Sequence, residues 1–207
     1  WDPEDVNYNT FRWITSNAGF AMGPSRVNPY TGQILDADII FDADFLTFWK
    51  NEFETLTAAQ LMGYETEPSD NETPIQRASR EFLARNPHAS RCMLRSGTSH
   101  QFAFGAAALA AAADPKVAAE LQEKLIMQGL KEVTMHEVGH TLGLRHNFKS
   151  STMLKNEQLH DTSITRKQGL LGSVMDYAPV NLAPRGVKQG DYFTTTLGPY
   201  DYRVIEY

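Results

Sequence analysis

One eleven-residue segment constrains this chain more than any other, because it fixes three histidines and a glycine at set spacings. Residues 136–146 read H-E-x-x-H-x-x-G-x-x-H. On a helix, residues four apart lie about 40° from one another and about 6 Å along the axis. His136 and His140 can therefore direct their imidazoles at one ion. Glu137 lies about 100° around the helix from His136, where it can reach a water molecule on that ion.

Gly143 gives the third histidine its route to the same ion. Glycine adopts the left-handed backbone conformation that ends a helix at low cost, so the chain turns and His146 approaches from another direction. Three neutral imidazoles leave one tetrahedral position of Zn²⁺ open, which distinguishes catalytic from structural zinc sites. An amphipathic helix with solvent-facing histidines is the alternative, but it gives no role to Gly143 or His146. The pattern predicts a zinc site with His136, His140 and His146 as ligands.

Length and charge limit the class of protein. With 207 residues, the chain suits one large domain or two small subdomains with a real core. Its net charge of −6 argues against nucleic acid or an anionic membrane as the main partner. No apolar run is long enough to span a bilayer. The single cysteine, Cys92, excludes an internal disulfide and is a better candidate for a structural thiol than for a nucleophile.

The chain begins with Trp1 and shows no signal peptide, whereas its last residues keep a regular pattern. We therefore expect a processed or excised part of a longer precursor.

The N-terminal part predicts a small sheet and several helices. Residues 11–15 and 33–41 have the apolar and polar alternation of strands. Residues 19–32 are rich in glycine, proline and asparagine, which predicts turns and loops. Helical periodicity is found at residues 44–62, 75–85 and 101–113.

Four aspartates at alternate positions allow two interpretations of this region. Asp36, Asp38, Asp42 and Asp44 are compatible with a calcium site, although the segment lacks the glycine and terminal glutamate of the helix-loop-helix calcium loop. The default interpretation is a strand with one polar face at Asp36 and Asp38. In that interpretation Asp42 or Asp44 caps a following helix.

A long helix is predicted to carry the first two metal ligands. Asp114 and Pro115 have the residue types of an N-cap and a first helical position. Apolar periodicity continues from there to Leu142, with Gly129 as the point where the helix bends or breaks.

The segment after His146 has mostly loop character and ends in a helix that starts at Pro199. The fold class is therefore α+β, with a small mixed sheet and long helices in the N-terminal part. We expect one catalytic domain composed of an N-terminal subdomain, residues 1–143, and a C-terminal subdomain, residues 144–207.

Residues 173–177, with the sequence Ser-Val-Met-Asp-Tyr, add a second motif to the histidine segment. Together the two motifs resemble those of the metzincin clan of zinc endopeptidases. Met175 follows His146 by 29 residues, and the resemblance implies that it forms an apolar floor beneath the histidines. In the astacin-like and serralysin-like branches, a tyrosine two residues after this methionine contacts zinc and stabilises the transition state. Tyr177 matches that position. For Met175 and Tyr177, simple packing in the core is the alternative.

Further stretches resemble large bacterial metzincin-like proteins, namely residues 3–13, 23–25, 32–35, 146–149 and 197–201. In those proteins the metzincin module belongs to a longer exported polypeptide, so the resemblance implies a periplasmic or extracellular location. Metzincins bind substrate along an edge strand. No segment of the N-terminal part is assigned to that strand from the sequence.

These residues predict hydrolysis of a peptide bond in a protein or peptide substrate. Zinc lowers the pKa of its bound water towards about 7 and polarises the scissile carbonyl. Glu137 moves the proton of the water to the leaving amine, and Tyr177 hydrogen-bonds the oxyanion. Two alternatives from other classes are a non-catalytic zinc module that binds peptides or proteins, and a zinc hydrolase that acts on a non-peptide amide.

Overall fold

The computed structural model describes residues 2–16, 21–43, 46–47, 105 and 115–207. The predicted helices at residues 44–62, 75–85 and 101–113 lie outside these ranges, apart from residues 46–47 and 105. Cys92 also lies outside them. The described part is a mixed α+β structure, in agreement with the predicted fold class.

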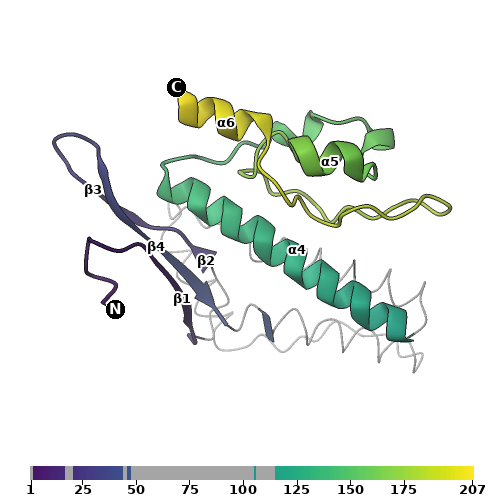
Figure 1. Cartoon of the computed structure of the whole chain (residues 1–207), viewed down its shortest axis with the longest axis horizontal. Coiled ribbons are helices and arrows are strands. Elements are labelled where there is room, and N and C mark those ends of the chain that lie inside the picture. The colour runs from purple at the N-terminus through teal and green to yellow at the C-terminus, as the bar shows by residue number, and fades with distance from the viewer. Residues whose placement is uncertain (1, 17–20, 44–45, 48–104, 106–114) are drawn as a thin grey trace, which may run out of the picture.

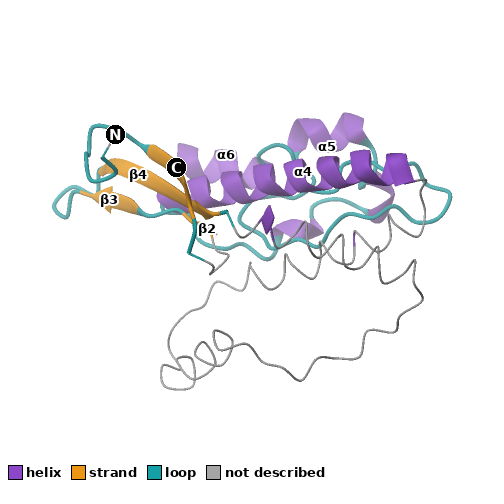
Figure 2. Ribbon diagram, turned by 90° about the horizontal axis from the view of Figure 1, so that it is seen from below, coloured by secondary structure: helices purple, strands orange, loops and turns teal. Residues whose placement is uncertain are grey.

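A small mixed sheet occupies one end of the described part (Figure 2). It consists of β1 (Thr10–Ile14), β2 (Ala21–Met22), β3 (Ser25–Val27) and β4 (Ile34–Asp42). The long β4 is central: β1 pairs with it in parallel, and β2 and β3 pair with it antiparallel. The strands predicted at residues 11–15 and 33–41 are confirmed.

The prediction of turns and loops throughout residues 19–32 is wrong in part, because β2 and β3 lie within them. Both are short, and both are held by pairing with β4. Cross-strand pairing of this kind outweighs the weak strand preference of a segment rich in glycine and proline.

The polar strand face expected at Asp36 and Asp38 also needs correction. Asp36 is buried, and Arg26 forms an ion pair with its carboxylate. Asp38 accepts a hydrogen bond from the hydroxyl of Thr10 on the neighbouring strand. A buried carboxylate requires such partners, since an isolated buried charge is strongly unfavourable.

Asp42 is the last residue of β4, and Asp44, the other residue predicted as a possible helix cap, lies outside the described residues, so the cap stays a prediction. Asp42 accepts a hydrogen bond from the Ser16 hydroxyl at 2.6 Å. Asp36, Asp38 and Asp42 thus each have a protein partner, which leaves the calcium interpretation without structural support.

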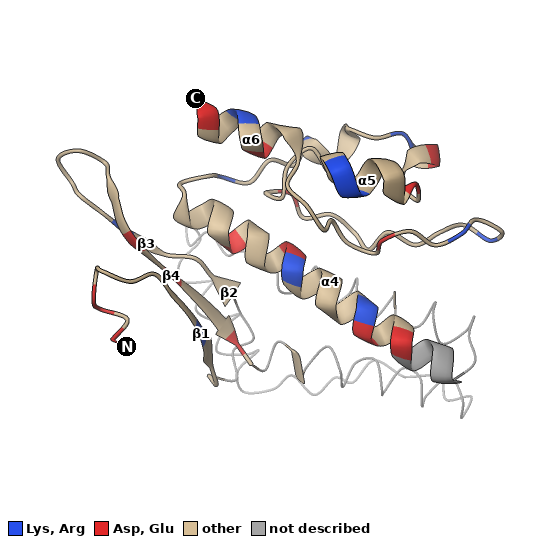
Figure 3. Cartoon of the chain, in the orientation of Figure 1, with Lys and Arg blue, Asp and Glu red and all other residues tan. Residues whose placement is uncertain are grey.

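The predicted long helix is α4 (Pro115–Thr141), and it continues through Gly129 without a break. Figure 1 shows α4 crossing the middle of the molecule, with the strands on one side and helices α5 and α6 on the other. Acidic and basic residues are interspersed along α4, whereas the charged residues of α5 are both basic (Figure 3). Among the described helices, none combines the length and the apolarity needed to cross a bilayer.

The C-terminal part is mostly loop, as predicted, with four short helices. They are η1 (Ser150–Thr152), η2 (Asn156–Gln158), α5 (Thr162–Gln168) and α6 (Pro199–Glu206). The helix predicted to start at Pro199 is confirmed as α6. Helix α5 was not predicted, although Asp161 caps its start by accepting a hydrogen bond from the Ser163 amide.

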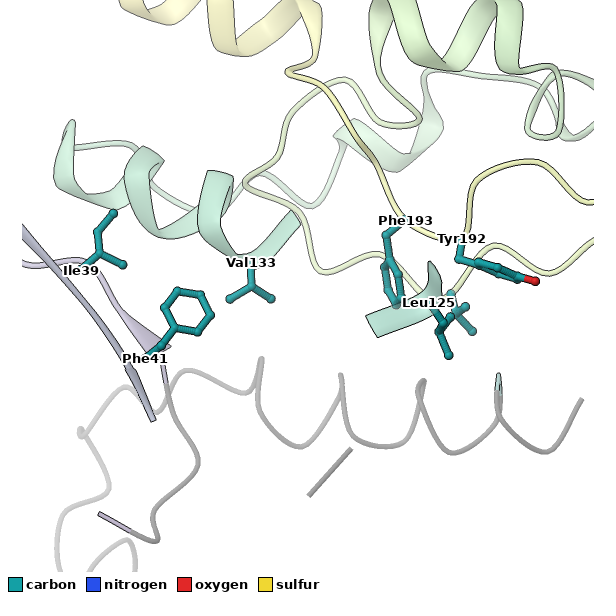
Figure 4. Close-up of a cluster of buried hydrophobic side chains, with 7 residues drawn as sticks. Ile39, Phe41, Leu125, Val133, Tyr192 and Phe193 are labelled. Carbon is teal, nitrogen blue, oxygen red and sulfur yellow. The ribbon is translucent and has the colours of Figure 1, made fainter. Parts of the chain in front are cut away.

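A buried apolar cluster joins the sheet, α4 and the C-terminal part (Figure 4). Its members come from β4, from α4 and from the loop segments near residues 180 and 192. Each large apolar side chain that is fully buried stabilises the fold by about 1.5–3 kcal/mol. The cluster consists of Ile39, Phe41, Leu125, Val133, Val180, Tyr192 and Phe193.

Asp191 fixes the C-terminal part to α4 and α5 through polar contacts. Its carboxylate is buried and accepts two hydrogen bonds from Arg166 of α5, at 2.7 and 2.9 Å. Gln128 of α4 donates a third at 2.8 Å. The position of α4 relative to the C-terminal loops is therefore set by polar as well as apolar contacts.

Candidate metal centre and active site

The last two turns of α4 carry the first two histidines of the motif. His136 and Glu137 are buried, with 1% and 2% of their surface exposed. His140 is half-buried, whereas His146 is exposed. The burial therefore decreases along the motif, and the site opens to solvent on the side of His146.

The turn that brings His146 back to the helix depends on Gly143. Gly143 has a φ of 85°, in the left-handed region that favours glycine, as predicted. Its amide donates to the carbonyl of His140 at 2.9 Å, and the Leu144 amide donates to the carbonyl of Gly139 at 3.0 Å. These bonds satisfy carbonyls at the end of α4 and direct the chain towards His146.

The three imidazoles converge, and they form the one metal-ligand cluster found in the described part of the chain. One nitrogen from each of His136, His140 and His146 lies within 4.8 Å of the other two. The Nε2 atoms of His140 and His146 are 3.1 Å apart. Two nitrogens held at about 2.0–2.1 Å by one tetrahedral zinc lie about 3.3 Å apart, so this spacing fits zinc.

Hydrogen bonds orient two of the rings for this purpose. Nδ1 of His136 donates to the carbonyl of Val174 at 2.7 Å, and Nδ1 of His140 donates to the carbonyl of Leu144 at 3.0 Å. With the proton on Nδ1, each ring presents an unprotonated Nε2, which is the form that binds a metal. Nε2 of His136 is buried and has no hydrogen-bond partner among the described residues. A metal ion would satisfy it.

Burial favours the neutral form of His136 and His146. Desolvation lowers the pKa of His136 to about 4, although its bond to the Val174 carbonyl opposes this change. The pKa of His146 is also lowered, mainly by burial and then by the nearby His140. Neutral imidazoles at neutral pH are ready to accept a divalent cation.

Met175 lies beneath the active-site helix. Its side chain is completely buried, and a Cβ built on Gly139 would be only 2.3 Å from its sulfur. The glycine between the two histidines of α4 thus provides the space that Met175 fills. Met175 therefore lies against α4 at Gly139, and its role as a floor for the histidine cluster stays a prediction.

Asp176 links the segment after His146 to the same turn. Its carboxylate accepts hydrogen bonds from the Ser150 hydroxyl and the Ser151 amide, both at 2.9 Å. The Asn147 amide donates to the Met175 carbonyl at 2.9 Å. The third histidine is therefore carried on a short segment that is bonded to the turn at residues 173–177.

Tyr177 lies beside His146 at the open side of the cluster. Its hydroxyl oxygen is hydrogen-bonded to Nε2 of His146 at 2.5 Å, and the two ring centroids are 4.4 Å apart. Phe148, which is 61% exposed, packs against both rings. The Tyr177 hydroxyl is therefore next to a nitrogen of the histidine cluster, on the side of the exposed His146.

Glu137 has an environment suited to a base. Burial raises its pKa to about 7, while a hydrogen bond from the Gly23 backbone acts in the opposite direction. Gly23 is also pressed against α4, because a Cβ there would lie 2.2 Å from the Glu137 carbonyl oxygen. The corner between β2 and β3 thus lies directly against the residue that follows the first ligand.

A comparison with protein families agrees with this geometry. Residues 118–207 match the family model described as Met-zincin. The matched segment, 90 of the 207 residues, resembles a Met-zincin domain. The match includes the three histidines and the turn at Met175, whereas the strands of the sheet precede it. No curated protein and no solved structure matches the chain.

Several residues that build this site were not predicted from the sequence. Gly139 had a local signal, since a glycine inside a helix is unfavourable and often has a packing reason. Gly23, Asp176 and Asp201 had none, because their contacts cross 20 to more than 100 residues of chain. Such contacts are visible only in the folded structure.

Proposed function

We propose that this protein is a zinc-dependent endopeptidase that hydrolyses peptide bonds in proteins or peptides. The observation that carries the proposal is the convergence of three imidazoles on one point, with a buried glutamate adjacent to the first of them. The match of residues 118–207 to the Met-zincin family model supports it.

Zinc held by His136, His140 and His146 would supply Lewis-acid chemistry, which acidifies a water molecule and polarises a carbonyl oxygen. Glu137 acts as general base: it takes the proton of the attacking water and passes it to the leaving amine. A pKa near 7 suits both halves of this transfer. Tyr177 donates its hydroxyl to the oxyanion that forms on the substrate.

Substrate entry from the side of His146 follows from the exposure of the site. We further propose that the substrate lies along β2 and β3, residues 21–27. Within the described part of the sheet these strands pair only with β4, so their outer edge is available for an added strand. Gly23 brings this edge against α4 at Glu137.

The division into subdomains at residue 143 and the export of the protein to the periplasm or the cell exterior are parts of the same proposal. The first is supported by the position of the histidine cluster between α4 and the loops that follow it. The second depends on the resemblance to exported bacterial proteins.

Degradation of casein by the purified protein tests the function. We expect degradation with zinc present and its loss with a chelator. A non-catalytic zinc module would bind zinc without degrading casein. A hydrolase of non-peptide amides would leave casein intact and release amine from small amide substrates, with the same zinc dependence. Either of these results would reject the endopeptidase proposal.

A further inference from the structure

Asp201 on α6 is a buried carboxylate that the proposed chemistry does not use. It is 3% exposed, and it accepts three hydrogen bonds. The Ser173 hydroxyl donates at 2.5 Å, the Val174 amide at 3.0 Å and the Gly198 amide at 2.9 Å. Two of these donors belong to the turn that contains Met175. The carboxylate therefore joins the start of α6 to the turn beneath the active-site helix.

A continuous hydrogen-bond chain leads from this carboxylate to the first histidine. Ser173 donates its hydroxyl proton to Asp201 and accepts a hydrogen bond from the Met175 amide at 3.1 Å. The Met175 amide N–H and the Val174 carbonyl belong to one peptide group. That carbonyl accepts the proton on Nδ1 of His136 at 2.7 Å.

Each link of this chain strengthens the next. The resonance of a planar peptide group couples its N–H to its C=O, so a good acceptor at the N–H increases the negative charge on the oxygen. A negatively charged carboxylate makes the Ser173 hydroxyl oxygen such an acceptor. A more negative Val174 oxygen holds the His136 ring more firmly and makes its Nε2 a better donor to a metal.

We propose that Asp201 and Ser173 are positioning residues for His136, which they orient and make more basic through the peptide group between Val174 and Met175. The inference rests on the metal binding of the proposed function. It extends that function by giving α6, at the far end of the chain, a part in setting the metal affinity of the site.

A second buried aspartate of this protein offers a matched control for this role. Asp191 is 2% exposed, lies in the same C-terminal part and also accepts several hydrogen bonds. Its partners are Arg166 of α5 and Gln128 of α4. Neither of them is hydrogen-bonded to a histidine of the triad. Asp191→Asn therefore reports the cost of disturbing a buried carboxylate without disturbing the chain to His136.

The experiment compares Asp201→Asn, Ser173→Ala and Asp191→Asn with the wild-type protein. The first measurement is the zinc dissociation constant, by competition with a chromophoric chelator. The second is the NMR chemical shift of the Nδ1 proton of His136, with and without zinc. We expect zinc binding about 10-fold weaker in the first two variants. We also expect the Nδ1 proton to move upfield in both, because its hydrogen bond is weakened. Asp191→Asn should change neither quantity.

The outcomes separate this inference from the proposed function. If the wild-type protein binds no zinc, the proposed function is rejected. The chemical shift of the Nδ1 proton in the metal-free protein then still tests the hydrogen bonds that lead from Asp201 to His136. Unchanged shifts and unchanged zinc affinity in both variants overturn the inference, and so does an equal change in Asp191→Asn. If Asp201→Asn does not fold, Ser173→Ala decides alone, because it leaves the two amide bonds to Asp201 in place.

Discussion

Gly139 lies against the sulfur of Met175, and a Cβ on this glycine would be 2.3 Å from that atom. The contact joins the middle of the histidine motif to a turn more than 30 residues later. It holds Met175 close to the backbone of α4, between the turns that carry His136 and His140. Met175 can occupy this position because residue 139 is a glycine, which has no Cβ atom.

Gly139→Ala should therefore destabilise the fold, even though alanine is the better helix former. The new methyl group overlaps the Met175 sulfur, and overpacking of this kind costs about 1–3 kcal/mol. Urea unfolding measures the loss. The same substitution in a Met175→Ala background should cost much less, because the obstructing sulfur is gone. Equal costs in both backgrounds would show that the two residues do not interact.

Tyr177→Phe should lower kcat with little change in KM. The lost hydroxyl is a donor to the developing oxyanion, and removal of one such donor costs about 10²–10³ in kcat. Phe148→Leu is the control, since it changes the aromatic packing around Tyr177 but removes no hydroxyl. A kcat for Tyr177→Phe within about twofold of the wild-type value would assign Tyr177 to packing alone.

His146→Ala should weaken zinc binding by more than the roughly 10- to 100-fold that follows from loss of an outer hydrogen-bond partner. One of three ligands is removed, and the two that remain are both on α4. Zinc content after dialysis against a mild chelator measures the effect. Phe148→Ala, an exposed neighbour without a ligand atom, serves as control. Equal zinc retention in the two variants would exclude His146 as a ligand.

Glu132 predicts a pH dependence of stability. It lies one turn before His136, and its pKa is raised to about 8, mainly by burial. A hydrogen bond from the Thr194 backbone acts in the opposite direction, and the charge of the nearby Asp176 acts in the same direction as burial. Its Oε1 has no hydrogen-bond partner among the described residues. The folded protein therefore holds a proton that the unfolded chain releases above pH 4.5.

The contribution of Glu132 to the free energy of unfolding is complete below pH 4.5. It is lost as the pH rises to 8, by up to about 1.4 kcal/mol per pH unit. Glu132→Gln removes this titration. We expect the stability of the variant relative to wild type to increase steadily from pH 5 to pH 8, as measured by urea unfolding. Contributions of the histidines cancel, because both proteins contain them. A difference that does not change with pH would contradict a buried, protonated Glu132.

The features that could be predicted from the sequence are those set by neighbouring residues. Spacing along one helix brings His136 and His140 together, and the backbone freedom of Gly143 directs His146 towards them. Pro199 has the residue type of a first helical position, and α6 starts there. In each case a few adjacent residues contain the physical cause.

The features that could not be predicted depend on contacts between distant segments. Strands β2 and β3 exist because β4 pairs with them, and two or three residues are too few to show the alternation that predicts a strand. Asp36 was expected to be polar and exposed, but Arg26 allows it to be buried. Asp201 reaches Val174 only after α6 has packed beside the turn. In each of these cases the structure depends on a partner that is distant in the sequence.

The central claim is that Glu137 acts as the general base of a zinc peptidase. Its most direct test is the turnover of an unfolded protein substrate by wild type and Glu137→Gln at equal zinc content. We expect the variant to retain one zinc per molecule and to lose about 10²–10⁴ in kcat, the contribution of a positioned base. Wild-type turnover by the zinc-loaded variant would contradict the account.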